Sequence, residues 1–253
     1  MPNPGGNYPG RQIAMGAIEG KPAFAYFVSG RSEKSQKRYA TPFLYPEHAI
    51  RINPLDMNEK FDQFRHYQAV RIDPETGLLL VSNSQAPNDA IFEAYKFKNM
   101  TKEDPFFRAA IILSSIGPEY DNKQKPTARV LGICDPSDIE DGEFDMFLQT
   151  KRPYGHQIGF GMNTIADGRM HFVQTYDGNV DYGDFDYTMF VDHKSAFDTS
   201  AKTPQDLAEE IYGSSDYIDP TYGVLRVSCI AGVRNGSGPG GWEIAIKNRY
   251  RVD

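Results

Sequence analysis

Four basic side chains follow one another closely between Gly30 and Arg38, in a chain whose net charge is −7. Over residues 31–38 these four bases face a single acid, Glu33, which leaves a local charge of +3. A guanidinium forms paired hydrogen bonds to phosphate, and each charge-assisted bond contributes roughly 1.5–3 kcal/mol. The run therefore indicates an anion site, with a solvated basic loop as the alternative. The four bases are Arg31, Lys34, Lys37 and Arg38.

Two further arginines lie in segments that otherwise have the composition of buried strands. Arg11 opens one such segment and Arg129 lies in another. A buried arginine needs a partner, either a carboxylate of the protein or the anion of a ligand. Glu119 follows Gly117-Pro118 and is a candidate both for that partner and for a catalytic carboxylate. An internal salt bridge and a ligand site explain these residues equally well.

Several polar side chains lie near the ends of predicted strands. Tyr67, Asn83 and Tyr176 offer hydroxyl and amide groups there, although each taken singly fits a structural position. His66 alone is read as a surface or packed histidine. The five histidines are scattered without the spacing of a helix face, so the sequence predicts no metal site.

Composition excludes several classes of protein. A net charge of −7 and a pI near 5.3 argue against a nucleic-acid-binding surface. Two distant cysteines exclude a disulfide scaffold. The best apolar stretch, Ala109–Leu113, is too short to span a bilayer and no signal peptide is evident, so a cytoplasmic protein without a membrane partner is expected. Pro2 disfavours an N-terminal nucleophile exposed by methionine removal.

The elements that must position these side chains are mostly strands. Apolar runs separated by turn signals predict strands over Arg11–Ile18, Pro22–Ser29, His66–Ile72, Leu78–Ser82, Thr127–Cys134, Glu143–Lys151, Arg169–Tyr176, Tyr187–Val191, Gly223–Val233 and Trp242–Arg249. Capping residues predict helices from Asn88 or Asp89 to about Lys98, from Asp104 to Gly117, and from Thr203 to Gly213. Hairpins with about three helices favour the α+β class, with two sheets packed face to face, and exclude a doubly wound sheet.

The same segments resemble the IMP cyclohydrolase family of archaea and its bacterial relatives. Tyr8–Ile13 is similar to the family's Tyr-x-Gly-Arg-x-Ile opening, and Ala25–Ser32 followed by Arg38 is similar to its Ala-Tyr-x-Val-Ser-Ser/Gly-Arg-Ser…Arg segment. Tyr67–Ile72 resembles a Tyr-Asn-x-Ile-Arg-Ile strand with Gln68 in place of Asn. The remaining matches are Val81–Asn83, Gly117–Glu119, Thr127–Val130 with Ala128 in place of Pro, the Thr203–Ile211 helix and Gly241-Trp242.

The resemblance implies a fold. Family members are similar to the N-terminal-nucleophile hydrolases, so a four-layer α-β-β-α sandwich without a processed nucleophile is expected. The chain is expected to be one domain over residues 1–253. The segments at about 135–168 and 177–200 align poorly with the family and are expected to be insertions.

The resemblance also implies an activity. The family closes 5-formamidoimidazole-4-carboxamide ribonucleotide (FAICAR) to IMP with loss of water, the last step of de novo purine biosynthesis. It implies a ribonucleotide substrate and no metal or other cofactor. It assigns catalysis to Tyr67, Glu119 and Arg38, and substrate binding to Arg11, Arg31, Asn83, Arg129, Tyr176 and Asp177.

Two other functions fit the same residues. One is a sister enzyme that acts on a different ribonucleotide or amide. The other is a purine-nucleotide-binding protein without catalysis. A homo-oligomer is compatible with the sequence, which does not determine the oligomeric state.

Overall fold

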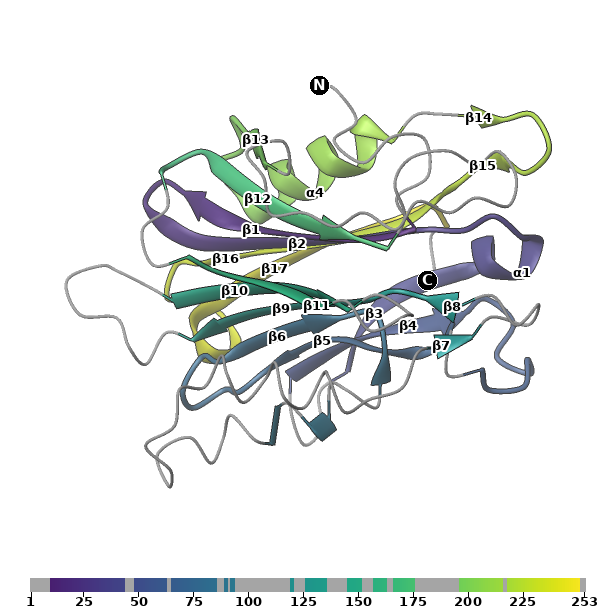
Figure 1. The fold of residues 1–253 in the computed structure, drawn as a ribbon, viewed down its shortest axis with the longest axis horizontal. Helices are drawn as coiled ribbons and strands as arrows, with labels where there is room; N and C mark the ends of the chain where they lie inside the picture. The colour runs from purple at the N-terminus through teal and green to yellow at the C-terminus, as the bar shows by residue number, and fades with distance from the viewer. Residues whose placement is uncertain are drawn as a thin grey trace.

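Antiparallel strands account for most of the structure, which is a computed structural model. It describes residues 10–43, 48–62, 65–85, 89–90, 92–93, 119–120, 126–135, 145–151, 157–162, 166–175, 196–215 and 218–250. The strands form two large sheets that lie one above the other (Figure 1). Within the described residues, no helix is both long enough and apolar enough to cross a membrane.

The first sheet has six strands in the order β13-β12-β1-β2-β16-β17. Its central hairpin turns through Glu19 and Gly20, whose φ angles of 50° and 69° are both positive. A two-residue turn of this kind matches the twist of the strands it joins. The bounds are β1 Arg11–Ile18, β2 Lys21–Ser29, β12 Arg169–Gln174, β13 Ala196–Asp198, β16 Arg226–Arg234 and β17 Trp242–Asn248.

The second sheet has seven strands in the order β11-β10-β9-β6-β5-β4-β3. Its bounds are β3 Arg38–Phe43, β4 His48–Pro54, β5 Tyr67–Ile72, β6 Leu79–Ser82, β9 Arg129–Asp135, β10 Asp145–Lys151 and β11 Gln157–Met162. Two small strand pairs and three short helices complete the described elements. They are β7 Glu119–Tyr120 with β8 Pro126–Thr127, β14 Ile218–Asp219 with β15 Gly223–Val224, α1 Glu33–Gln36, α4 Pro204–Ser214 and the 3-10 helix η4 Pro239–Gly241.

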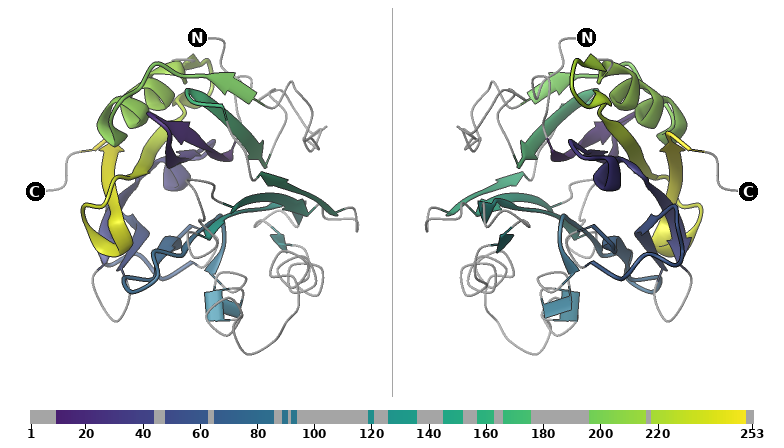
Figure 2. Two further views of the ribbon diagram at one scale, coloured as in Figure 1. Left: turned by 90° about the vertical axis from the view of Figure 1, so that its left-hand side faces the viewer. Right: turned by 90° about the vertical axis from the view of Figure 1, so that its right-hand side faces the viewer.

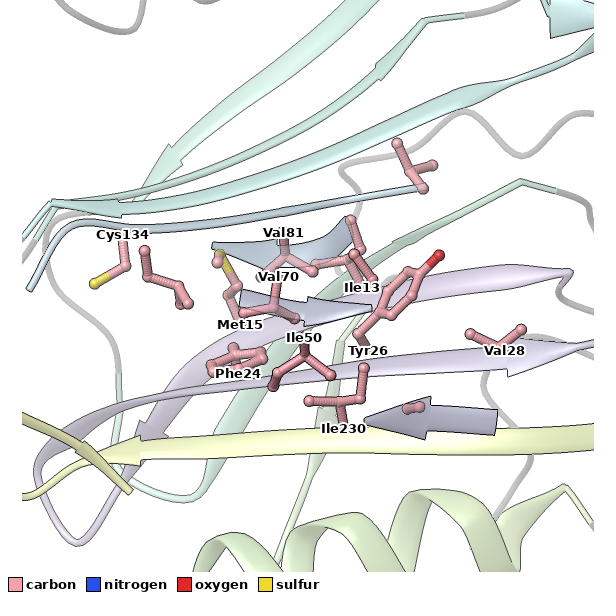
Figure 3. Packing of buried hydrophobic residues seen from close by; sticks show 14 of the residues in the cluster. Ile13, Met15, Phe24, Tyr26, Val28, Ile50, Val70, Val81, Cys134 and Ile230 are labelled. Atoms are coloured by element: carbon pink, nitrogen blue, oxygen red, sulfur yellow. The ribbon is translucent and has the colours of Figure 1, made fainter. Parts of the chain in front are cut away.

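The two faces of β2 are buried in two different cores. Phe24, Tyr26 and Val28 point toward the second sheet, in the core seen in Figure 3. Ala25 and Phe27 point the other way, into a second core beneath α4. Side chains alternate along a strand, so a strand covered on both faces is apolar throughout. This explains why the segment reads as one continuous apolar run.

Helix α4 lies on the outer face of the six-stranded sheet, as the side views show (Figure 2). The Thr203 hydroxyl accepts a hydrogen bond from the Asp206 amide, and the Asp206 side chain accepts one from the Thr203 amide. This capping box starts the helix where the sequence predicts it. Leu207, Ala208 and Ile211 then pack against the sheet.

The expected four-layer α-β-β-α sandwich is wrong. The described residues are mainly antiparallel sheet, with two short α-helices, and only α4 lies as a layer on a sheet. The structure is therefore a β-rich fold. The predicted helix from Asp104 to Gly117 lies outside the described residues, as does all but residues 89, 90, 92 and 93 of the helix before it.

The prediction of two sheets facing each other is confirmed, and most predicted strands agree with the structure to within a few residues. Strands β3 and β4 were not predicted from the sequence, and they form one edge of the seven-stranded sheet. Strands β10 and β11 lie within the segment expected to be an insertion at about 135–168. The predicted strand Tyr187–Val191 lies outside the described residues.

Asn248 joins the edges of the two sheets. Its side-chain oxygen accepts the backbone N–H of Ala40 at 2.8 Å, and its side-chain nitrogen donates to the Ala40 carbonyl at 2.9 Å. We expect Asn248→Ala to lower the free energy of unfolding by about 1–3 kcal/mol, because both backbone groups of the buried Ala40 lose their partner. Urea unfolding measures this change. Asn58→Ala, at an exposed loop position, should change stability by less than about 0.5 kcal/mol, and equal effects would contradict the bridging role.

Candidate functional site

Two tyrosines meet in the core between the sheets. Tyr26 comes from β2 and Tyr67 from β5, and their exposed fractions are 0% and 1%. Their hydroxyl oxygens lie 2.6 Å apart in a hydrogen bond in which either phenol can be the donor. This buried hydrogen bond links the two sheets within the core that they share.

The surroundings of Tyr26 keep its phenol protonated. Burial, followed by the neighbouring Tyr67, raises the pKa of Tyr26 well above its usual range, while the positive charges of Arg11 and Arg38 oppose the shift. Since folding favours the protonated phenol, this stability is complete below a pH of about 10 and is lost as pH rises through the raised pKa. Tyr26 therefore keeps its proton at neutral pH and can donate a hydrogen bond, and two guanidinium groups act on it electrostatically.

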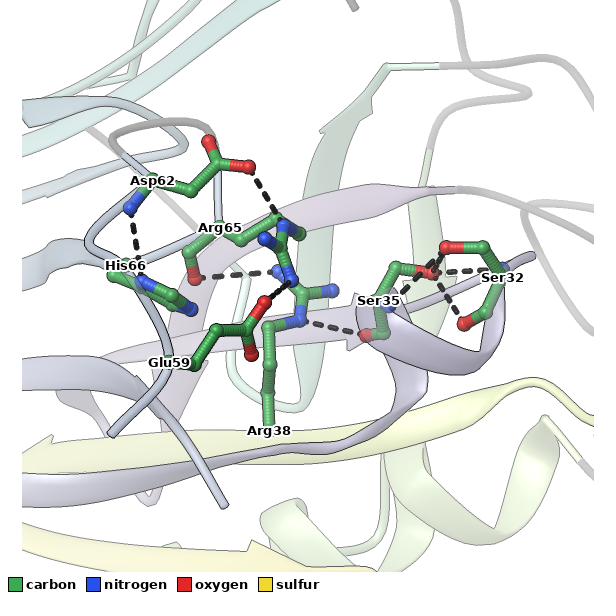
Figure 4. A network of polar contacts seen from close by, with 7 residues as sticks. All are labelled: Ser32, Ser35, Arg38, Glu59, Asp62, Arg65 and His66. Carbon is green, nitrogen blue, oxygen red and sulfur yellow. Dashed lines mark hydrogen bonds and ion pairs between the residues drawn. The ribbon is translucent and has the colours of Figure 1, made fainter. Parts of the chain in front are cut away.

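Arg38 is buried completely, although it ends the basic run. It is the first residue of β3, and its guanidinium donates to three backbone carbonyls: Ser35 at 2.6 Å, Ser29 at 3.4 Å and Arg65 at 3.5 Å. Figure 4 shows the guanidinium between α1 and the loop that carries Arg65. Arg38 thus fastens three separate segments around one positive charge.

Helix α1 presents the Ser35 carbonyl to Arg38. Ser32 and Ser35 form a capping box that starts this single turn, and the Gln36 side chain donates to the Gly30 carbonyl at 3.1 Å. Only a glycine at position 30 allows α1 to pack this closely, because a Cβ at that position would lie 2.5 Å from the Ser35 carbonyl oxygen.

We expect Gly30→Ala to displace α1 and to reduce activity at least about 10-fold, because a contact of this length forces the backbone to move. Steady-state kinetics and urea unfolding measure the two consequences. Gly213→Ala is the matched control, since nothing lies within 4 Å of the Cβ it would add. Activity of Gly30→Ala equal to that of the control would contradict the role given to α1.

The remaining bases of the run differ from Arg38 in their surroundings. Lys34 and Lys37 are exposed, and Lys37 forms an ion pair with Glu33 at 2.6 Å. Arg31 is partly exposed at the end of β2. The basic run therefore contains three side chains that are exposed or partly exposed and one buried guanidinium.

The side chains of Asn83 and Arg129 join the residues that follow β6 to the start of β9 in the seven-stranded sheet. The Asn83 amide donates to the Ala128 carbonyl at 2.9 Å and accepts the Val130 amide at 3.0 Å. Arg129 donates to the hydroxyl oxygen of Ser84. Asn83 is thus bonded to the start of β9.

Arg11 starts β1 and faces Val28 in the sheet. Its backbone N–H donates to the Thr175 hydroxyl at 3.0 Å. Glu119 belongs to the short strand β7, and its side chain lies outside the described part of the structure. Tyr176 and Asp177 also lie outside the described residues.

The structure thus joins Tyr67 to Tyr26 by a hydrogen bond, and the positive charges of Arg11 and Arg38 act on Tyr26. Sequence reasoning missed Tyr26, although it lies in the segment Ala25–Ser32 that carried part of the family resemblance. It also gave no role to His66, which is buried directly before Tyr67. A tyrosine in a wholly apolar strand was the available signal for Tyr26.

These features define a β-rich protein whose candidate site is a buried pair of phenols between two antiparallel sheets, on which the buried Arg38 and the partly exposed Arg11 act electrostatically. The family model of the IMP cyclohydrolase-like proteins matches residues 8–231, and the chain belongs to this family. Membership supports a cyclohydrolase-type role as a hydrolase in purine biosynthesis, with a nucleotide-related substrate. No curated protein matches the chain.

Proposed function

We propose that this protein closes FAICAR to IMP with loss of water. The buried Tyr26–Tyr67 pair carries this proposal, because ring closure needs a protonated donor in a site shielded from water. Family membership supports the nucleotide-related substrate. The nearby charges of Arg11 and Arg38 fit an anionic ligand.

The reaction forms one bond and breaks another. The carboxamide nitrogen attacks the formyl carbon, and the electrons of the formyl C=O bond move to its oxygen. In our assignment Tyr67 donates a proton to that oxygen, while Glu119 accepts the proton that the nitrogen loses. In the second half of the assigned reaction the carbon–oxygen bond breaks, and Glu119 returns its proton to the leaving hydroxyl, which departs as water. The formamido nitrogen gives its proton to the Tyr67 phenolate and forms a double bond to the same carbon, which completes the pyrimidine ring of IMP and restores both side chains.

The carboxamide nitrogen is a weak nucleophile, so orientation must supply much of the rate. Holding the nitrogen in line with the formyl carbon can remove several kcal/mol of the barrier. We assign this holding to Arg38 with Arg11 and Arg31, which bind the phosphate or orient the imidazole carboxamide. Asn83 and Arg129 act by fixing the strands beside the pair. Tyr176 and Asp177 remain predicted contributors at the edge of the site.

A substrate panel tests the specificity. We expect kcat/KM for FAICAR to exceed that for the same compound without its phosphate by at least about 10³-fold, since remote binding energy positions the reacting groups. Addition of EDTA should leave the FAICAR rate unchanged. Faster turnover of a different formamido ribonucleotide would contradict the proposed substrate and favour a sister enzyme.

A further inference from the structure

His66 is held in a fixed orientation by the loop before β5. Its ring Nδ1 accepts the backbone N–H of Asp62 at 3.1 Å, and its own backbone N–H donates to the Asp62 carbonyl at 2.7 Å. The residue is only 2% exposed, and its ring lies against Phe61 with the ring centroids 6.0 Å apart. In Figure 4 the ring lies below Asp62 and beside Glu59, and Arg38 lies further to the right.

This geometry fixes the tautomer of His66. A ring nitrogen that accepts a hydrogen bond carries no proton, so the neutral ring has its proton on Nε2. Nε2 is buried and has no hydrogen-bond partner among the residues that the structure describes. A buried donor left without a partner costs roughly 1–3 kcal/mol, so such a group needs an explanation.

The charged groups around His66 sum to zero, and its ring is neutral. Arg65 forms ion pairs with Glu59 at 2.6 Å and with Asp62 at 2.7 Å. Together with Arg38, the groups that act on the ring are two positive and two negative. Burial first, and then Arg65, lowers the pKa of His66 below its ordinary value. The ring is therefore an uncharged donor at neutral pH.

His66 is connected to the candidate site through the chain. It directly precedes Tyr67, and the carbonyl of the residue before it, Arg65, accepts a hydrogen bond from Arg38. The Arg65–His66 segment is thus hydrogen-bonded to the buried guanidinium of Arg38 and continues directly into the strand that carries Tyr67.

We propose that His66 is a substrate-contacting residue that donates its Nε2–H to an uncharged oxygen of the bound ribonucleotide. A carbonyl, formyl or ribose hydroxyl oxygen fits better than the phosphate, because the charges that face the ring sum to zero. This inference rests on the proposed function, since it takes the ligand to be a purine ribonucleotide or its precursor.

Two substitutions separate a ligand contact from a structural role. His66→Asn keeps an acceptor near the position of Nδ1 for the Asp62 amide but removes the Nε2 donor. His66→Gln places an amide N–H near the position of Nε2. We expect His66→Asn to weaken binding of IMP about 10-fold, the loss of one hydrogen bond, and His66→Gln to stay within about threefold of wild type. Binding of inorganic phosphate should be the same in all three proteins.

Isothermal titration calorimetry measures these affinities, and nitrogen-15 NMR of the histidine rings reads the site directly. The Nε2–H signal of His66 should move when IMP is added and stay in place with inorganic phosphate. IMP affinity unchanged in His66→Asn, an Nε2 signal that ignores IMP, or no binding of IMP by the wild type would overturn the inference. A signal that moves in a protein that does not turn over FAICAR would keep the inference and reject only the proposed reaction.

Discussion

Replacing Tyr67 by Phe is expected to lower kcat for FAICAR closure by about 10²–10³-fold. The substitution removes only the hydroxyl, so the donor to the developing oxyanion is lost while the buried ring stays in the core. KM should change little, because the interaction is made mainly in the transition state. Pre-steady-state measurement of IMP formation tests this directly.

Tyr26→Phe and Tyr212→Phe are the comparisons for this result. Tyr26→Phe removes the partner at 2.6 Å but leaves the Tyr67 hydroxyl, so we expect a smaller loss of about 10-fold. Tyr212 belongs to α4 and is buried in the other core, and its hydroxyl should not matter for turnover. A Tyr67→Phe variant as active as Tyr212→Phe would remove the phenol from the mechanism.

Arg38→Ala is expected to abolish measurable turnover and also to weaken the fold. The substitution removes one positive charge beside the tyrosine pair and leaves three carbonyls, of Ser29, Ser35 and Arg65, without their donor. We expect the free energy of unfolding to fall by about 2–4 kcal/mol. Kinetics and urea unfolding on the same preparation measure both effects.

Arg38→Lys separates the two roles. Lysine keeps the charge but cannot reproduce the planar fork that reaches several carbonyls. We expect it to recover part of the stability and less than about a hundredth of the activity. Arg169→Ala is the control, because it breaks an exposed ion pair with Asp198 worth less than about 1 kcal/mol. Full turnover in folded Arg38→Ala would contradict the role of Arg38 at the site.

Local signals in the sequence were sufficient to predict most strands. They were not sufficient to predict how the strands pair or how the layers are arranged. The β1–β2 hairpin could be predicted because Glu19 and Gly20 form a turn between two apolar runs. The pairing of β1 with β12 could not, because residues such as Gln12 and Gln174 are brought together only by the sheet. The expectation of helices outside the two sheets came from the capping signals, and the family resemblance extended it to four layers, which the structure contradicts.

The residue types at the candidate site could be predicted from the sequence, but the burial of their side chains could not. The basic run correctly drew attention to Arg38, yet its composition resembles an exposed loop and gives no sign that one guanidinium is buried. Strand β3 begins there but shows no apolar alternation in its sequence, because its first buried position is held by Arg38 and its apolar residue Phe43 is exposed. The Tyr26–Tyr67 contact joins residues 41 positions apart on different sheets, so it depends on how the sheets pack.

The rate of IMP formation from FAICAR by the purified protein is the measurement that tests the proposed function most directly. Ring closure by the buried phenol pair predicts saturable turnover at least about 10⁶-fold faster than the uncatalysed reaction, at neutral pH. That acceleration should fall about 10²–10³-fold in Tyr67→Phe. A rate equal to the uncatalysed one, whether or not IMP binds, would contradict the proposed reaction.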